Sequence, residues 1–165
     1  MSWRSSFYPA ATLALGALIA TPFALGQESS GPPPKDTIFA RKILMGAIAS
    51  NMDEIETMLA PNGKFDAAEA QDHADTISIM LMSFPHMFPA ATNQWKPGAD
   101  RDPATDTYAS PDLWANFVDF YQRASNASKL AQDASTTKRL DEFKTLIGEL
   151  RTACNGCHEK YMKSN

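Results

Sequence analysis

The chain ends in RTACNGCHEKYMKSN, residues 151–165, a stretch that holds both of its cysteines, Cys154 and Cys157, followed directly by His158. The apolar positions that lead into this stretch, at alternating spacings of three and four, are Leu140, Phe143, Ile147 and Leu150. Such spacing marks one face of a helix. Because both thiols continue it and His158 lies one turn after Cys154, the sequence predicts a terminal helix with three reactive groups on its buried side.

The pattern Cys-x-x-Cys-His is typical of covalent haem attachment. In that chemistry the thiols of Cys154 and Cys157 each add to one vinyl group, which gives two thioether bonds, and the imidazole of His158 binds the iron. Both thiols are then consumed, which agrees with a chain that has no other cysteine. The sequence therefore predicts one covalently bound haem c per chain, with His158 as an iron ligand.

Three other uses of these residues remain open at the level of sequence. A zinc site needs four ligands, and only His73 and His86 are available to extend the group. A thioredoxin-like redox pair belongs near a βαβ pattern, and the sequence shows no convincing strand. A structural disulfide would leave His158 unexplained. Haem attachment accounts for all three residues and is the preferred interpretation.

Two helices are predicted in the first half of the chain. The first spans residues 36–59 with Asp36 as its cap, and the second spans residues 66–83 and stops before Pro85. Their apolar faces comprise Ile38, Met45, Ile48, Met52, Ile55 and Leu59 on the first helix and Ala70, Ala74, Ile77, Leu81 and Phe84 on the second. Arg41 falls on the first face, where its charge must either find an anionic partner or snorkel to solvent.

A long loop separates these helices from two more. Residues 85–111 contain five prolines and are expected to form a loop over one end of the domain. A third helix is predicted to begin with Ser110 as its cap and Pro111 as its first residue. Its inward-facing residues are predicted to be Leu113, Phe117, Phe120, Ala124, Ala127 and Ala131. Four amphipathic helices with one long crossing predict an all-α fold, an antiparallel four-helix bundle.

The N-terminus has the features of an export signal. Arg4 precedes the apolar run of residues 10–20, and Ala24 and Gly26 occupy the small-residue positions of a cleavage site. The run is short for a membrane span, and an uncleaved anchor is the alternative. The predicted organisation is a signal peptide at 1–26, a flexible leader at 27–35 and the haem-binding bundle at 36–165.

The overall composition argues against some classes of function. The chain has 165 residues, 44% of them hydrophobic and 21% charged, which suits one soluble domain with its own core. Its formal net charge is −4 and no basic stripe is visible, so nucleic acid is not an expected partner. No carboxylate pair or nucleophile–base arrangement can be placed at a site, and the protein is not expected to be an enzyme.

A haem motif at the end of the last helix of a bundle resembles the class II c-type cytochromes, the cytochrome c′ family. The resemblance covers residues 36–163. The segments that carry it are CNGCH (154–158), IFARKILM (38–45), FP at Phe88 and Pro89, and SPDLWANFVDF (110–120). The resemblance implies a haem between helices near one end of a bundle, in a protein of the bacterial periplasm.

The resemblance also assigns roles to individual residues. It implies that His158 is the proximal ligand, that Met45 occupies the distal position, and that Arg41 lies beside the haem propionates. Many relatives carry a basic residue four positions after the haem histidine, where this chain has Met162. Trp114 and Tyr121 are expected near the haem edge or the long loop. Family members occur as monomers and as dimers packed through their first two helices, so monomer and homodimer both remain open.

The role of Met45 separates two functions. In low-spin members of the family a methionine there binds the iron, and the protein transfers single electrons with a redox partner protein, here unidentified. In high-spin members a bulky apolar residue blocks the iron, and nitric oxide or carbon monoxide binds. Met45 fits both roles, and also plain core packing. Electron transfer is the preferred interpretation, because a well-placed thioether tends to be used. The weaker candidates for the iron are Met52, Met58, Met87, His73 and His86.

Overall fold

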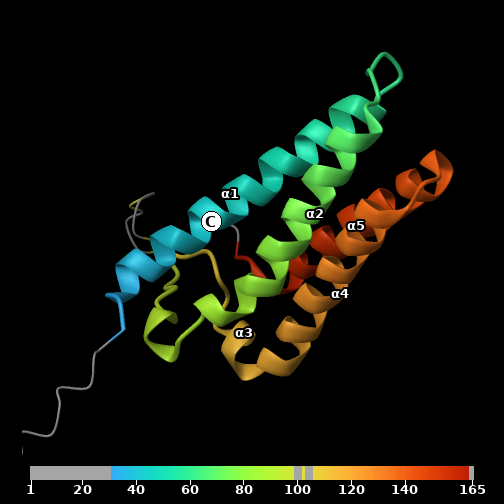
Figure 1. The fold of residues 1–165 in the computed structure, drawn as a ribbon. Helices are drawn as coiled ribbons and strands as arrows, with labels where there is room; N and C mark the ends of the chain where they lie inside the picture. Colours follow the sequence, from blue (N-terminus) through green and yellow to red (C-terminus); the bar gives the residue numbers. More distant parts are fainter. Residues whose placement is uncertain (1–30, 99–101, 103–105, 164–165) are drawn as a thin grey trace, which may run out of the picture. The chain divides into compact units, whose positions relative to one another are not determined.

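The computed structural model describes residues 31–98, 102 and 106–163, so the predicted signal peptide and the start of the leader lie outside it. The long helices are α1 (Pro34–Leu59), α2 (Ala67–Ser83), α4 (Phe117–Thr136) and α5 (Leu140–Tyr161), and the short ones are the 3₁₀ turns η1 (Phe84–Met87) and η2 (Ala90–Thr92) and the single turn α3 (Asp112–Ala115). The described residues contain no β-strand (Figure 1). The long helices pack in the order α1, α2, α4, α5 as an antiparallel bundle, which confirms the predicted fold class.

The first two helices begin in different ways. α1 begins at Pro34, two residues earlier than predicted, because a proline has its φ preset for the first turn and no N–H to satisfy there. Asp36 lies within this first turn and does not cap the helix, so that prediction was wrong. α2 begins as predicted, with the Asp66 carboxylate accepting the backbone N–H groups of Ala68 at 2.9 Å and Glu69 at 3.1 Å.

The predicted third helix is interrupted at Asn116. There φ is −124° and ψ is 38°, so α3 ends and α4 begins at the next residue. The Asn116 side chain donates a hydrogen bond to the Asp112 carbonyl at 2.9 Å, and the same carbonyl accepts the Asn116 backbone N–H at 3.0 Å. The prediction of Ser110 as the cap and Pro111 as the first helical residue was wrong by one position: α3 begins at Asp112 and Pro111 precedes it, although the Ser110 hydroxyl accepts the Asp112 N–H at 3.2 Å. Phe117, predicted to face inward, is instead 38% exposed.

Small residues let α2 and α4 approach each other closely. The buried small residues of this seam are Ala70, Ala74 and Ser78 on α2 and Ala127, Ser128, Ala131 and Ala134 on α4. The Ser128 hydroxyl donates to the Ser78 carbonyl at 2.8 Å, which satisfies polar groups across the seam. Larger side chains complete the core, namely Ile48, Met52, Ile55, Ile77, Phe143, Ile147 and Leu150. Leu140, predicted to face inward, is 43% exposed at the first position of α5.

The loop between α2 and α4 packs against the end of α5. Its described parts include η1 and η2, so it holds more helical structure than its prolines suggested. The Ser110 N–H donates to the Tyr161 carbonyl at 2.8 Å, and the Lys163 N–H donates to the Tyr108 carbonyl at 2.8 Å. These bonds place the loop beside the last turn of α5. In the described part of the chain, no helix is both long and apolar enough to span a bilayer.

Candidate haem-binding site

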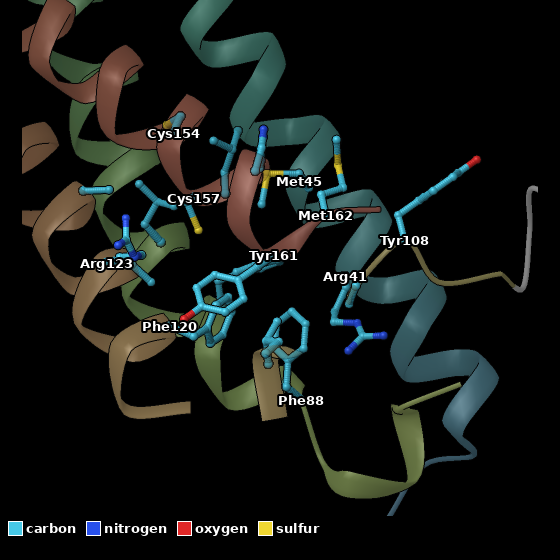
Figure 2. A pocket seen from close by; sticks show the side chains of 18 of the residues that line it. Arg41, Met45, Phe88, Tyr108, Phe120, Arg123, Cys154, Cys157, Tyr161 and Met162 are labelled. Carbon is cyan, nitrogen blue, oxygen red and sulfur yellow. The ribbon is translucent and has the colours of Figure 1, made fainter. Parts of the chain in front are cut away.

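A cavity lies at this end of the bundle, surrounded by side chains of α1, α4, α5 and the loop (Figure 2). It contains about 960 Å³ of space between atoms, part of it open to solvent. Most of its lining is apolar, and a few polar side chains face it. A concave, largely apolar space with a few placed polar groups is typical of a cofactor site.

All five predicted site residues line this one cavity. Arg41 and Met45 reach it from α1, whereas Cys154, Cys157 and His158 reach it from the end of α5. In Figure 2 the side chains of Met45 and Cys157 extend from different helices toward the same space. The fold therefore brings together residues from opposite ends of the described chain.

The thiols and the imidazole are in states that suit haem attachment. Cys154 and Cys157 are free, half-buried thiols, and burial raises the pKa of both. Burial, helped by the positive charge of Arg151, lowers the pKa of His158. The half-buried imidazole is therefore neutral at neutral pH and keeps a lone pair for a metal ion.

Arg41 places a buried positive charge at the wall of the cavity. The residue is only 5% exposed, so its guanidinium does not snorkel to solvent. It donates hydrogen bonds to the hydroxyl oxygens of Thr92 at 3.1 Å and Thr107 at 3.2 Å, and its Cζ lies 4.2 Å from the centre of the Phe88 ring. Burial lowers the pKa of Arg41 to about 10, so the group stays charged at neutral pH. No carboxylate of the described residues pairs with it.

These features fit a haem c placed between α1 and α5. The apolar lining suits the faces of a porphyrin, and the two thiols line the same cavity with the Cys-x-x-Cys spacing that is typical of haem attachment. A propionate would give the guanidinium of Arg41 an anionic partner, which the carboxylates of residues 31–98, 102 and 106–163 do not provide.

The other histidines lie away from the cavity. Nδ1 of His73 is 2.7 Å from Oδ1 of Asn51, and the His86 ring packs edge-on against Tyr121 with centroids 5.9 Å apart. Neither ring lines the cavity. Within residues 31–98, 102 and 106–163, no three His, Cys, Asp or Glu side chains are grouped as a metal ion would require. The zinc interpretation therefore finds no support there.

Two methionines of the described chain line the cavity, Met45 and Met162. Met52 lies in the core and Met58 packs against it, while Met87 packs against the aromatic side chains of the loop. Met162 follows His158 by four residues and caps the same helix, whereas Met45 comes from α1. A ligand for the second face of a haem is thus available from Met45.

Aromatic rings form one wall of the cavity. Phe88 packs edge-on against Phe120 with centroids 4.8 Å apart, and Phe120 packs against Tyr161 at 5.6 Å. Phe120 is buried, as predicted. Trp114 donates its indole N–H to the Phe88 carbonyl at 3.1 Å, which confirms its expected place beside the loop. Tyr121 is 42% exposed and lies beside η1, also part of the loop.

No sequence pattern indicated which protein side chains contact Arg41. Thr92 and Thr107 lie in the loop, where no periodic pattern singles out a residue, and both are buried. Phe88 belongs to the FP segment that resembles the cytochrome c′ family, but nothing local pairs its ring with a guanidinium. The contacts depend on how the loop folds back onto α1.

A second polar cluster, also unexpected from the sequence, joins α4 to the end of α5. The Asp119 carboxylate accepts hydrogen bonds from the Tyr161 hydroxyl, from Lys160 at 2.9 Å and from Arg123 at 2.8 Å. These donors, Arg123 first, hold the pKa of Asp119 well below its usual range. Tyr161 and Arg123 also line the cavity, so the cluster fixes part of its wall.

We expect Asp119→Asn to destabilise the protein at neutral pH and to have a smaller effect in acid. A carboxyl with a depressed pKa stabilises the fold above its ordinary pKa of 3.8, and that stabilisation is lost as the pH falls below this value. The difference in Tm between parent and variant should therefore shrink on acidification. Thermal unfolding followed by circular dichroism tests this, with Asp133→Asn, which breaks an exposed ion pair with Lys129, as the control. A pH-independent difference would contradict the assignment.

Comparison with known families gives a match to the model described as Cytochrome C′, over residues 36–162. Cytochrome c′ of Allochromatium vinosum is 27% identical over 146 residues, which is 84% of this chain and 90% of the relative. Cytochrome c-556 of Agrobacterium fabrum is 26% identical over 123 residues, covering 73% of this chain and 77% of the relative.

Among solved structures, cytochrome c prime from Shewanella frigidimarina is similar in fold, with a TM-score of 0.68 and 25% identity. The similarity covers 79% of this chain and 97% of that structure. The region that matches the family model, residues 36–162, contains every residue that lines the cavity.

Proposed function

Because the chain belongs to the cytochrome c′ family, whose members bind one covalent haem c per chain, we propose that it transfers single electrons through a haem ligated by His158 and Met45. The family consists of electron carriers and gas binders rather than classical enzymes. The haem supplies a centre whose iron gains or loses one electron. The protein would supply attachment through Cys154 and Cys157, iron ligands from His158 and Met45, and an apolar surrounding.

The position of Met45 is the observation that carries this proposal. Its thioether lines the cavity from α1, while His158 lines the same cavity from α5. A haem between these helices would present one face to each ligand. Met162 belongs to the end of α5, the same helix as His158, and is therefore the weaker candidate for a second ligand.

The remaining site residues have different roles in holding the haem. Cys154 and Cys157 would form the thioether bonds and would hold the haem beside His158, which lies on the same helix. Arg41 binds a propionate, and the aromatic wall of Phe88, Phe120 and Tyr161 keeps water from that side of the cavity.

This arrangement favours electron transfer for physical reasons. A thioether ligand raises the reduction potential of a haem relative to a site with histidine alone. Both proposed ligands stand on long helices of the bundle, so little rearrangement is needed when the charge of the iron changes. Gas binding would require that Met45 leave the iron, or that it never bind.

The visible absorption spectrum of the matured protein tests the ligation. The parent is expected to show a low-spin, six-coordinate haem, and Met45→Ala is expected to convert it to a high-spin form. Carbon monoxide should bind to the variant rapidly and to the parent poorly, because the substitution removes the competing sulfur. The midpoint potential should fall as the thioether is lost.

Met162→Ala is the matched control, because it removes the other thioether of the cavity. Its spectrum should stay low-spin. A high-spin parent would instead support the five-coordinate reading, in which Met45 only blocks the distal face and nitric oxide or carbon monoxide binds. A low-spin parent that changes in Met162→Ala and not in Met45→Ala would overturn the assignment of the ligand.

We infer that the protein is exported to the bacterial periplasm, on the basis of the N-terminal signal and the family to which the chain belongs. Its redox partner would be another protein of that compartment. The haem must be attached after export, while the thiols of Cys154 and Cys157 are reduced.

A further inference from the structure

Side chains of the loop hold the Arg41 guanidinium in place without any ligand. Its two terminal nitrogens donate to the hydroxyls of Thr92 and Thr107, which come from opposite parts of the loop and are 0% and 5% exposed. The Phe88 ring covers the guanidinium at 4.2 Å. Three loop residues thus fix one cation of α1.

The positions of the two hydroxyls are themselves determined by further bonds. Thr92 donates its own hydroxyl hydrogen to the Pro89 carbonyl at 2.8 Å, and Thr107 accepts the Ala109 N–H at 3.0 Å. The Lys42 ammonium donates to the Asp106 carbonyl at 3.1 Å, which ties the residue before Thr107 to α1. Both hydroxyls therefore present an oxygen lone pair to Arg41 from a fixed backbone.

The same part of the loop is bonded to the helix that bears the haem motif. Ser110 donates to the Tyr161 carbonyl and Lys163 donates to the Tyr108 carbonyl, each at 2.8 Å. Residues 106–110 therefore connect α1 with α5 along one side of the cavity. A shift of this segment would move Thr107 relative to both helices.

We propose that Thr92 and Thr107 are positioning residues that aim the Arg41 guanidinium at the cavity, so that it binds an anionic carboxylate side chain of the haem. This inference rests on the haem site of the proposed function but not on iron ligation by Met45. Hydroxyl oxygens are neutral acceptors, so they orient the guanidinium without cancelling its charge. The group has five N–H donors, and those not used by the threonines are available to a carboxylate.

The midpoint potential of the haem should show whether Thr92 and Thr107 hold Arg41 in place; we call this arrangement the threonine clamp. A positive charge held near a carboxylate lowers the pKa of that carboxyl by roughly one to three units. With Arg41 aimed correctly, the propionate stays ionised throughout the neutral range, and the midpoint potential is nearly independent of pH there. Arg41 also opposes the extra positive charge of the oxidised state, and so raises the potential.

The test is a redox titration of the haem-loaded protein from mildly acidic to mildly alkaline pH. Thr92→Val with Thr107→Val keeps the size of both side chains and removes both acceptors. This variant should have a lower midpoint potential than the parent, with a pH dependence at the acidic end of the titration that the parent lacks, because the carboxyl regains its ordinary pKa of about 4. Thr92→Ser with Thr107→Ser keeps the hydroxyls and should behave like the parent. Thr145→Val removes an exposed hydroxyl that bonds only within α5, and it should change nothing.

A double-mutant cycle with Arg41→Gln shows whether the threonines act through Arg41. Arg41→Gln alone should lower the potential and introduce the pH dependence. Adding the two valines to it should cause no further change. Additive effects, or a valine variant identical to the parent, would overturn the proposal. If the double valine variant does not fold, Thr107→Val alone, in both backgrounds, gives the same comparison.

These outcomes are independent of the proposed iron ligation. The potential and its pH dependence can be measured whether the haem is low-spin or high-spin. A high-spin parent whose midpoint potential still falls in the double valine variant would refute ligation by Met45 and would support the threonine clamp. A low-spin parent whose midpoint potential is unchanged in the double valine variant would be consistent with ligation by Met45 and would refute the threonine clamp.

Discussion

The double variant Cys154→Ser with Cys157→Ser is expected to lose all of its haem when the protein is denatured. Each thiol is assigned one of the two covalent bonds to the haem, and serine cannot form a thioether. Acidified organic solvent should therefore extract the colour completely from the variant and leave it with the polypeptide in the parent. Mass spectrometry of the denatured parent should show the polypeptide plus one haem.

The single variants Cys154→Ser and Cys157→Ser provide the internal control. Each keeps one of the two thiols, so each should retain haem through one bond. The absorption band of the pyridine complex should shift in each, because one vinyl group is left unreacted. A parent that weighs no more than its polypeptide after extraction would remove the basis of the haem site, as would haem that stays attached to the double variant.

Leu150→Ala is expected to cause a large loss of stability. Leu150 is fully buried in α5, among side chains of the central cluster. Truncating a buried leucine removes apolar contacts and leaves a cavity, which costs about 2–5 kcal/mol. Because typical domains are stable by only about 5–15 kcal/mol, such a loss should be easily measured.

Leu140→Ala is the matched control, because it makes the same substitution in the same helix at a residue that is 43% exposed. It should cost less than about 1 kcal/mol. Chemical denaturation followed by circular dichroism, with haem-loaded protein throughout, gives both values. Equal losses in the two variants would show that the packing of α5 differs from that described.

The helices were predictable because their signals are local. Apolar residues at alternating spacings of three and four mark α1, α2 and α5, and Asp66 marks the start of α2. The Cys-x-x-Cys-His pattern lies within two turns of α5, so the grouping of its thiols and imidazole follows from helix geometry alone. The same local rule put Arg41 and Met45 on one face of α1.

Local signals also misled at particular residues. Phe117 and Leu140 continue apolar patterns but are exposed, since each stands at the first residue of its helix, next to a turn. The break at Asn116 lies in the backbone angles of one residue, which the periodicity of apolar positions does not reveal.

The helical bundle, the haem motif and its place on the last helix were predictable from sequence, because each depends on spacings of a few residues. The surroundings of Arg41 and the hydrogen bond between Tyr161 and Asp119 became visible only in the folded protein. Arg41 meets Thr92 and Thr107 across 51 and 66 positions of sequence. Such contacts form only when the loop folds back onto α1, because buried polar groups need hydrogen-bond partners. The sequence of the loop has no periodic pattern from which these partners could be predicted.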